Sequence, residues 1–360
     1  MKSHKTRILA LIAVLAVAAL VWFGRNRIHF NWGVFVEQLR MANWGRIAVG
    51  LACIYLGYVV RAARWAMLMR HSKRVPLFSL LGAQVIGFTA VALIGRVADL
   101  VRPYLVARKT VQPLSSQIAV YIVERLFDAG AMAFITFSVI LMAAPGALPH
   151  PEVVKKASLL GLVLMVAGGL FLLAVRLWGA AIGAAAGGIF GRISKKLGEA
   201  VENKIAAFRS GLDTIRSVGD FAIAASLSIG MWLLIAVAYL ETARAFVAAP
   251  ALGSMTAPDS VLLMVISGTA STIQLPVLGW FTQIGLVEEA IRNFFGVSPE
   301  AAMGCAATLL LVTFLGIVPV GLIWSRFEQV SLRKVAQESE HASEDLAHRP
   351  AEPVRSEAAS

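Results

Sequence analysis

Residues 80–107 read LLGAQVIGFTAVALIGRVADLVRPYLVA, and this stretch decides the architecture of the chain. Its first arm, 80–94, is an apolar run of 15 residues that ends at Gly95, and a second apolar arm follows at 97–107. At about 1.5 Å per residue, such an arm covers roughly 22 Å as a helix, which is short of a hydrocarbon core of about 30 Å. The two arms therefore form either one full span with a surface helix or a re-entrant hairpin that enters and leaves on one side of a membrane.

A second stretch repeats this pattern nearer the C-terminus. Residues 261–275 are apolar, stop before Pro276, and are followed by another short arm at 284–295. The two stretches share little sequence, so an inverted repeat of the kind found in transporters is predicted from topology and not from sequence similarity.

The composition indicates a polytopic membrane protein. Of the 360 residues, 58% are apolar and 15% are charged, against about 25% charged residues in a soluble domain. So little charge cannot cover the surface of a soluble protein of this length, which excludes a cytosolic enzyme and a disordered chain. A spanning helix needs about 20 apolar residues, and six runs qualify as full spans. They cover residues 8–24, 46–66, 114–143, 157–178, 220–248 and 301–325.

Basic residues decide between the two arrangements, because cytoplasmic loops collect Lys and Arg. If both short stretches span fully, the Lys and Arg residues divide into 15 inside and 16 outside. If both are re-entrant, 24 lie inside and 7 outside, with Arg125 and Arg244 within spans. The second arrangement obeys the positive-inside rule. The sequence therefore predicts an all-α polytopic membrane protein with six full transmembrane helices and two opposed re-entrant hairpins, at about 80–107 and 261–295, in a pseudo-inverted-repeat bundle like that of transporters.

The predicted transmembrane domain covers residues 1–325. Within it, residues 189–218 combine basic residues with apolar residues every three to four positions, which predicts an amphipathic helix on the cytoplasmic membrane surface or an ordinary linker helix. Residues 326–360 are polar and predict a disordered cytoplasmic tail. Residues 8–24 are interpreted as a span and not as a cleaved signal peptide, because no soluble secreted domain follows them.

Ionisable residues at membrane depth are costly, so they usually face a cavity or each other. Two groups of three stand out. They are Arg96, Asp99 and Arg102 in the first hairpin and Glu124, Arg125 and Asp128 in the third span. The first group lies along one predicted helical face, and in the second Glu124 and Asp128 share a face while Arg125 can reach Asp128. Together the two groups carry three positive and three negative charges, which fits either a structural ion-pair lock or an anion site. In an anion site, Arg binds phosphate through two parallel hydrogen bonds while carboxylates hold the Arg in place.

Three further residues complete the candidate substrate site. Arg61 and Arg64 lie near the cytoplasmic end of the second span, where basic side chains often only extend to the membrane surface. Glu288 in the second hairpin either meets a cationic or hydroxylated headgroup or faces water.

Signatures of enzymes and of metal sites are missing from the sequence. The six histidines are scattered through loops and termini, and the two cysteines, Cys53 and Cys305, lie in apolar runs. Neither a catalytic triad, nor a metal site, nor a disulfide is expected from this distribution. There is also no P-loop. We therefore expect no catalytic residue, no cofactor, no metal and no nucleic-acid partner.

The order and spacing of the charged motifs resemble the transmembrane-domain family of lysylphosphatidylglycerol synthase, whose members are also described as flippase-like membrane proteins. The resemblance covers roughly residues 8–325 and rests on four motifs. They are Arg61-x-x-Arg64-Trp65, Leu93-x-x-Arg96-x-x-Asp99-x-x-Arg102, Ser116 followed by Glu124-Arg125-x-x-Asp128, and Gly285-x-x-Glu288.

The chain departs from the family pattern at both hairpin tips. The family favours a Pro and a Gly-Glu pair in the first hairpin and Pro-Gly-Gly in the second. The residues found there are Ile94, Ala98 and Asp99 in the first and Phe281, Thr282 and Gln283 in the second. These differences bear on the identity of the substrate more than on the fold.

The resemblance implies a lipid translocase, or flippase, that moves a phospholipid or lipid-linked headgroup across the cytoplasmic membrane. In two-domain relatives, a soluble synthase domain attaches lysine to phosphatidylglycerol. This chain ends about 35 residues after its last predicted span, so we expect no such domain and no enzyme activity.

Two alternatives stay open at this point. One is an intramembrane enzyme that modifies a lipid headgroup, with the third-span carboxylates as its only candidate acid–base pair. The other is a non-transporting scaffold for a lipid-pathway enzyme. The expected partner is a membrane lipid, either an anionic or aminoacylated phospholipid or a lipid-linked glycan, with a lipid-biosynthesis enzyme as a second partner. The expected location is the inner (cytoplasmic) membrane, with several spans and both termini in the cytoplasm.

Overall fold

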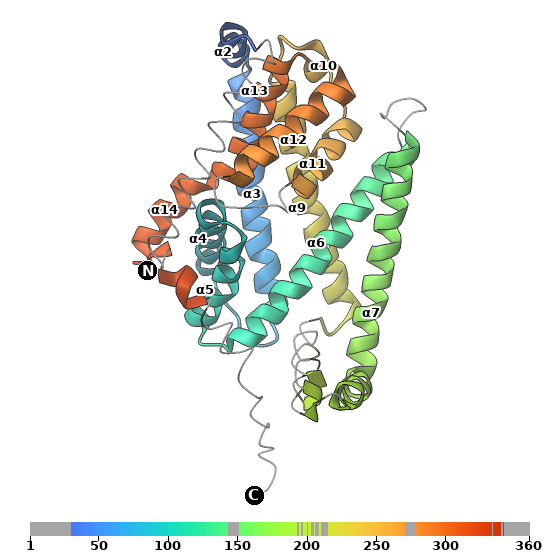
Figure 1. The fold of residues 1–360 in the computed structure, drawn as a ribbon. Helices are drawn as coiled ribbons and strands as arrows, with labels where there is room; N and C mark the ends of the chain where they lie inside the picture. Colours follow the sequence, from blue (N-terminus) through green and yellow to red (C-terminus); the bar gives the residue numbers. More distant parts are fainter. Residues whose placement is uncertain are drawn as a thin grey trace, which may run out of the picture. The chain divides into compact units, whose positions relative to one another are not determined.

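The structure is a computed structural model, and it describes residues 30–142, 151–192, 215–270 and 278–332, with parts of 194–209 and 334–341. Within these residues every regular element is a helix and there is no strand (Figure 1). The protein is an all-α polytopic membrane protein, as the sequence predicts. The first predicted span, residues 8–24, lies outside the described residues.

Figure 1 shows the helices in their order along the chain. Their bounds are α2 Trp32–Met41, α3 Trp44–Met69, α4 Leu77–Ile94, a 3₁₀ turn Arg96–Leu100, α5 Val101–Thr110, α6 Leu114–Met142, α7 Pro151–Gly191, α9 Val218–Arg244, α10 Pro250–Gly253, α11 Ala257–Ala270, α12 Leu278–Phe295, α13 Pro299–Leu310, a π-helical turn Leu311–Leu315, and α14 Ile317–Phe327.

Four stretches are long and apolar enough to cross a membrane: α3, α4, α9, and the continuous run Pro299–Phe327. Three of them agree with the predicted spans 46–66, 220–248 and 301–325. The predicted spans 114–143 and 157–178 form the long helices α6 and α7. Helix α6 has 29 residues, and it carries the charged run Glu124-Arg125-x-x-Asp128 in its middle. The number of six full spans stays a prediction.

The predicted transmembrane domain divides into two compact units. Unit 1 comprises residues 1–51 and 238–314, and unit 2 comprises 52–237 and 315–360. Each unit contains one of the two predicted hairpins.

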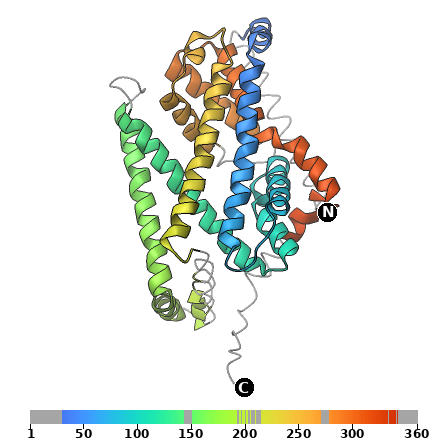
Figure 2. The ribbon, with the colours of Figure 1, turned by 180° about the vertical axis from the view of Figure 1, so that it is seen from behind.

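In unit 2 the first predicted hairpin is a pair of helices that reverses direction (Figures 1 and 2). Gly95, with φ of 93°, ends α4 and lets the chain turn into the 3₁₀ segment, a backbone conformation that favours glycine. Helix α5 then returns to the start of α4, since the Lys109 ammonium donates to the carbonyl of Ser79 at 3.1 Å. The Lys73 ammonium donates to the carbonyl of Thr110 at 2.7 Å. Both ends of the hairpin therefore lie at the end of α3.

Helix α4 packs against α14 through small residues. A Cβ on Gly321 would collide with the side chain of Thr89, and a Cβ on Gly82 would collide with Trp324 and Glu328. The two glycines therefore allow the helices to approach closely, which is how many membrane helices associate.

In unit 1 the second predicted hairpin also forms a helix pair, α11 and α12. The Gln283 amide of α12 donates to the Ser267 hydroxyl of α11 at 2.8 Å, and both side chains are buried. The tip of this hairpin, residues 271–277, lies outside the described residues. The re-entrant placement of both helix pairs in a membrane stays a prediction.

The structure describes residues 326–332 and 334–339 of the predicted tail, and the disorder of 326–360 stays a prediction. Residues 334–339 are helical, and Val335 and Ser339 are buried. The Tyr104 hydroxyl of α5 donates to the Glu338 carboxylate at 3.0 Å. Contacts with α5 thus give the segment a partner that its polar composition does not reveal. Residues 342–360 lie outside the described residues, as does much of 189–218.

Candidate anion site

Three helices of unit 2 bring six charged side chains into one buried cluster. These are Arg61 and Arg64 of α3, Arg102 of α5, and Glu124, Arg125 and Asp128 of α6. We call this set the arginine cluster.

Helical spacing explains how each helix presents its residues. Arg61 and Arg64 are three residues apart in α3, and Glu124 and Asp128 are four apart in α6, so each pair projects from one face. Arg102 lies in the first turn of α5, directly after the chain has turned at Gly95. The hairpin thus inserts one arginine beside the pairs from α3 and α6.

Glu124 is the most heavily shared carboxylate of the cluster. It accepts from Arg64 Nη2 at 2.8 Å and from Arg61 Nη1 at 3.2 Å. It also contacts Arg102 Nη1 and Arg125 Nη2, each at 3.3 Å. Four guanidinium groups therefore share this one carboxylate.

Asp128 is shared by three of the same arginines. Its oxygens lie 2.6 Å from Arg64 Nη1, 2.8 Å from Arg125 Nη2 and 3.4 Å from Arg61 Nη1. Arg64 bridges the two carboxylates with its two terminal nitrogens, and its Nη1 also donates to the Ser228 hydroxyl of α9 at 2.6 Å. This planar geometry is one that Lys cannot reproduce.

The cluster holds more positive than negative charge in a buried setting. Four arginines face two carboxylates, and Arg64, Arg102 and Glu124 are each 1% exposed. Asp99, which is half-buried in the 3₁₀ turn, acts electrostatically on Arg125. Even with Asp99 counted, these side chains carry one excess positive charge, and an uncompensated charge in a low-dielectric setting favours an anionic ligand.

Aromatic rings surround the guanidinium group of Arg102. Its Cζ lies 4.4 Å from the ring centre of Phe88, 5.0 Å from that of Tyr121 and 5.8 Å from that of Trp65. Such contacts stabilise a cation when little water is present. They hold Arg102 in place without using its hydrogen-bond donors.

Several buried donors in the cluster and beside it have no hydrogen-bond partner among the described residues. They are Nε of Arg64, Arg102 and Arg125, together with the side-chain amides of Gln84 and Gln117. All five are N–H groups, and a buried donor left unpaired costs about 1–3 kcal/mol. A ligand that relieves this cost must bring acceptor oxygens, as a phosphate or a carboxylate does.

A glycine makes room for Arg102. A Cβ on Gly87 of α4 would collide with the Arg102 side chain. One turn of α4 earlier, the side-chain amide oxygen of Gln84 accepts from Arg102 Nη1 at 3.1 Å. Helix α4 therefore positions this arginine as well as forming the first arm of the hairpin.

The structure corrects one interpretation drawn from the sequence and adds residues to the candidate site. Arg61 and Arg64 do not extend to the membrane surface, because both are buried in the cluster. Glu288 belongs to unit 1 and pairs with Arg292 at 3.5 Å. The side chain of Arg96 lies outside what the structure describes. Gln84 and Ser228 were missed, although a lone Gln inside the apolar run 80–94 is a signal that could have identified the first.

The sequence matches one known protein family over most of its length. The profile of the lysylphosphatidylglycerol synthase TM region matches residues 8–321, which is most of the chain. The chain belongs to this family. No curated protein and no solved structure is significantly similar to it. Membership of the lysylphosphatidylglycerol synthase TM region family associates the protein with lipid pathways in a membrane.

Among the described residues, no group of His, Cys, Asp and Glu side chains is arranged to hold a metal ion. The arginine cluster of this lysylphosphatidylglycerol synthase TM region protein contains the residue types that can bind an oxyanion.

Proposed function

We propose that the protein is a lipid translocase that moves a lipid with an anionic headgroup between the two leaflets of the cytoplasmic membrane. The observation that supports this proposal is the arginine cluster, with four guanidinium groups against two carboxylates and unpaired N–H donors. The family assignment also supports this proposal, since it associates the chain with lipid pathways in membranes.

The physical barrier to lipid movement is the loss of water from the headgroup phosphate. Guanidinium groups replace that hydration with charge-assisted hydrogen bonds, often in a bidentate arrangement. The acyl chains can stay in the bilayer, so the protein has only to provide a polar path for the headgroup.

Arg125 offers the entry to this path. Its side chain is 39% exposed, whereas that of Arg102 is 1% exposed. Both arginines contact Glu124, and both lie over the ring of Tyr121. A lipid phosphate that first binds Arg125 can therefore pass to Arg102 without leaving the cluster.

The alternative of an intramembrane enzyme is disfavoured by the state of its two candidate carboxylates. Glu124 is shared by four arginines and Asp128 by three. Because these ion pairs stabilise the charged form of both carboxylates, each is a weak base, whereas a general base must accept a proton from its substrate.

The test uses the purified full-length protein in phosphatidylcholine vesicles with a labelled lipid in one leaflet. We expect labelled phosphatidylglycerol and its lysyl derivative to change leaflet without added nucleotide, faster than in empty vesicles. Product formation from the lipid would support the enzyme instead. If phospholipids, isoprenoid-linked sugars and hopanoid-type lipids all behave as in empty vesicles, the translocase proposal is wrong and the scaffold remains.

A further inference from the structure

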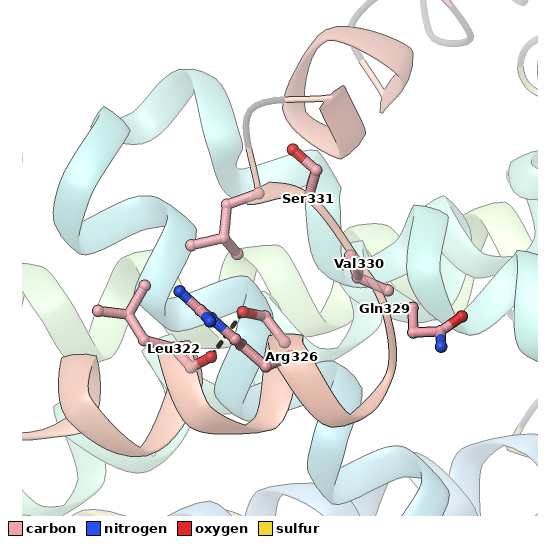
Figure 3. A pocket seen from close by; sticks show the side chains of 7 residues that line it. Leu322, Arg326, Gln329, Val330 and Ser331 are labelled. Atoms are coloured by element: carbon pink, nitrogen blue, oxygen red, sulfur yellow. Dashed lines mark hydrogen bonds between the residues drawn. The ribbon is translucent and has the colours of Figure 1, made fainter.

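A hollow of unit 2 lies at the C-terminal end of α14 (Figure 3), and its lining residues are different from those of the arginine cluster. It has a volume of about 490 Å³ and is lined by the last turns of α14 and by residues 329–332, where the chain reverses. A neighbouring hollow of about 450 Å³ shares Leu322 and Arg326 with it and extends to Ile323 and Phe327.

The walls of this hollow are held in place by a closed turn. The Val330 amide donates to the carbonyl of Ser325 at 2.8 Å, which is the bond that closes many helix C-termini. Glu328, within the turn, accepts from Lys109 at 2.5 Å and from the Trp324 indole at 3.1 Å. The turn is therefore fixed to α5 and is not a free surface loop.

Among the residues that the structure describes, Arg326 is the only charged one that lines either hollow. It is exposed, and among the described residues it makes no ion pair. The nearest acid along the chain, Glu328, is already paired with Lys109. In Figure 3 the Arg326 side chain extends toward Leu322, while the Gln329 amide points away from it. The hollow thus offers one unpaired cation above an apolar wall.

The apolar wall continues along the outer face of α14. Leu322, Ile323 and Phe327 are 44%, 58% and 83% exposed. In a membrane protein such a face lies against lipid chains. A ligand that satisfies both parts of the surface is an amphiphile, with a negative headgroup at Arg326 and an acyl chain along α14.

The basic residues near the hollow also indicate which leaflet of the membrane the hollow faces. The contact between Glu328 and Lys109 places the end of α14 beside the basic segments at Lys73–Arg74 and Arg108–Lys109. Basic loops lie predominantly on the cytoplasmic side. We propose that the hollow at Arg326 is a binding site for an anionic phospholipid of the cytoplasmic leaflet, separate from the arginine cluster.

The test is photo-crosslinking of the full-length protein in phosphatidylcholine vesicles that contain phosphatidylglycerol with a photoreactive acyl chain. Peptide mapping is expected to find the crosslink within residues 322–332. Arg326→Gln should lower the apparent affinity at that peptide about tenfold, because one charge-assisted contact is lost. The matched control is Arg74→Gln, which removes an exposed charge at the same end but outside the hollow, and it should change the affinity less than twofold.

The outcomes distinguish a specific lipid site from general electrostatic attraction of anionic lipids to basic residues and from binding of inorganic phosphate alone. Equal losses in the two variants, or no loss in either, would overturn the proposal. Phe327→Asn should weaken the lipid crosslink several-fold while leaving competition by inorganic phosphate unchanged. If Phe327→Asn has no effect on the lipid, the site recognises the phosphate ion alone and the lipid proposal is wrong.

Discussion

Glu124 and Arg102 play unequal parts in the arginine cluster, although they contact each other. Glu124 is one of two carboxylates among four arginines, while Arg102 is one of four cations. Removing Glu124 leaves Arg61, Arg64 and Arg125 with Asp128 as their one partner inside the cluster, and it leaves Arg102 with no carboxylate there. Removing Arg102 leaves Glu124 with three.

This asymmetry predicts the order of two stability losses. Glu124→Gln should lower the free energy of unfolding by about 3–5 kcal/mol, as expected when a buried charge loses its partner. Arg102→Gln should lower it by about 1–3 kcal/mol, because Gln84 loses a hydrogen bond but Glu124 stays paired. Thermal unfolding of both variants in detergent measures the order. Equal losses, or a larger loss for Arg102→Gln, would contradict the excess of positive charge in the cluster.

Gly87 allows a second prediction at a single residue. Gly87→Ala places a methyl group where the Arg102 side chain runs, so it should destabilise the protein by about 1–3 kcal/mol and impair lipid movement. Gly57→Ala is the matched control, since a Cβ on this buried glycine of α3 meets nothing within 4 Å. It should be neutral or stabilise the helix by up to about 1 kcal/mol. If the two variants behave alike, Gly87 does not position Arg102.

For single residues, the sequence identifies which charged side chains matter more readily than it identifies the side chains that they contact. Glu124, Arg125 and Asp128 stand out because charge inside an apolar span is costly. The roles of Arg61 and Arg64 could not be predicted, because a cation near the end of a span looks the same whether it reaches the membrane surface or a buried carboxylate. Tertiary contacts decide between the two.

At the scale of elements, the predicted membrane topology depends on the helix pair α4–α5. Lys73 contacts Thr110, and Lys109 contacts Ser79, so the loop before the pair and the loop after it lie together. The length of residues 80–107 allows two arrangements, and the distribution of basic residues around this stretch predicts the return. The 3₁₀ turn at Arg96–Leu100 was not predicted, because Arg96, Asp99 and Arg102 were placed on one continuous helical face.

Cysteine labelling checks this topology directly. In a protein with Cys53 and Cys305 replaced by Ala, we introduce Ser72→Cys, Val111→Cys or Ser254→Cys, all at exposed positions. A membrane-impermeant maleimide added to intact cells should label only Ser254→Cys, because the other two lie in basic loops. Labelling of Val111→Cys but not of Ser72→Cys would mean that the helix pair crosses the membrane, and the re-entrant prediction would fall.

At the scale of the whole molecule, composition and charge distribution were enough to predict an all-α polytopic membrane protein. The division into two compact units was not predicted, since α3 and α9 contribute residues to both and nothing in their sequences marks a boundary. The contacts of Glu328 with Lys109 and of Glu338 with Tyr104 were also not predicted, because the polar composition of this segment does not reveal its partners.

The central claim is that the arginine cluster moves lipids by binding their phosphate. The most direct measurement compares leaflet exchange in vesicles for two lipids, phosphatidylglycerol and a glycolipid without phosphate, in the wild type and in Arg102→Lys. This variant keeps the charge but loses the planar fork. We predict that the wild type moves phosphatidylglycerol at least tenfold faster than the glycolipid, and that Arg102→Lys loses most of this difference while still unfolding at a similar temperature. Equal rates for the two lipids in the wild type, or full activity of Arg102→Lys, would contradict phosphate recognition by the arginine cluster.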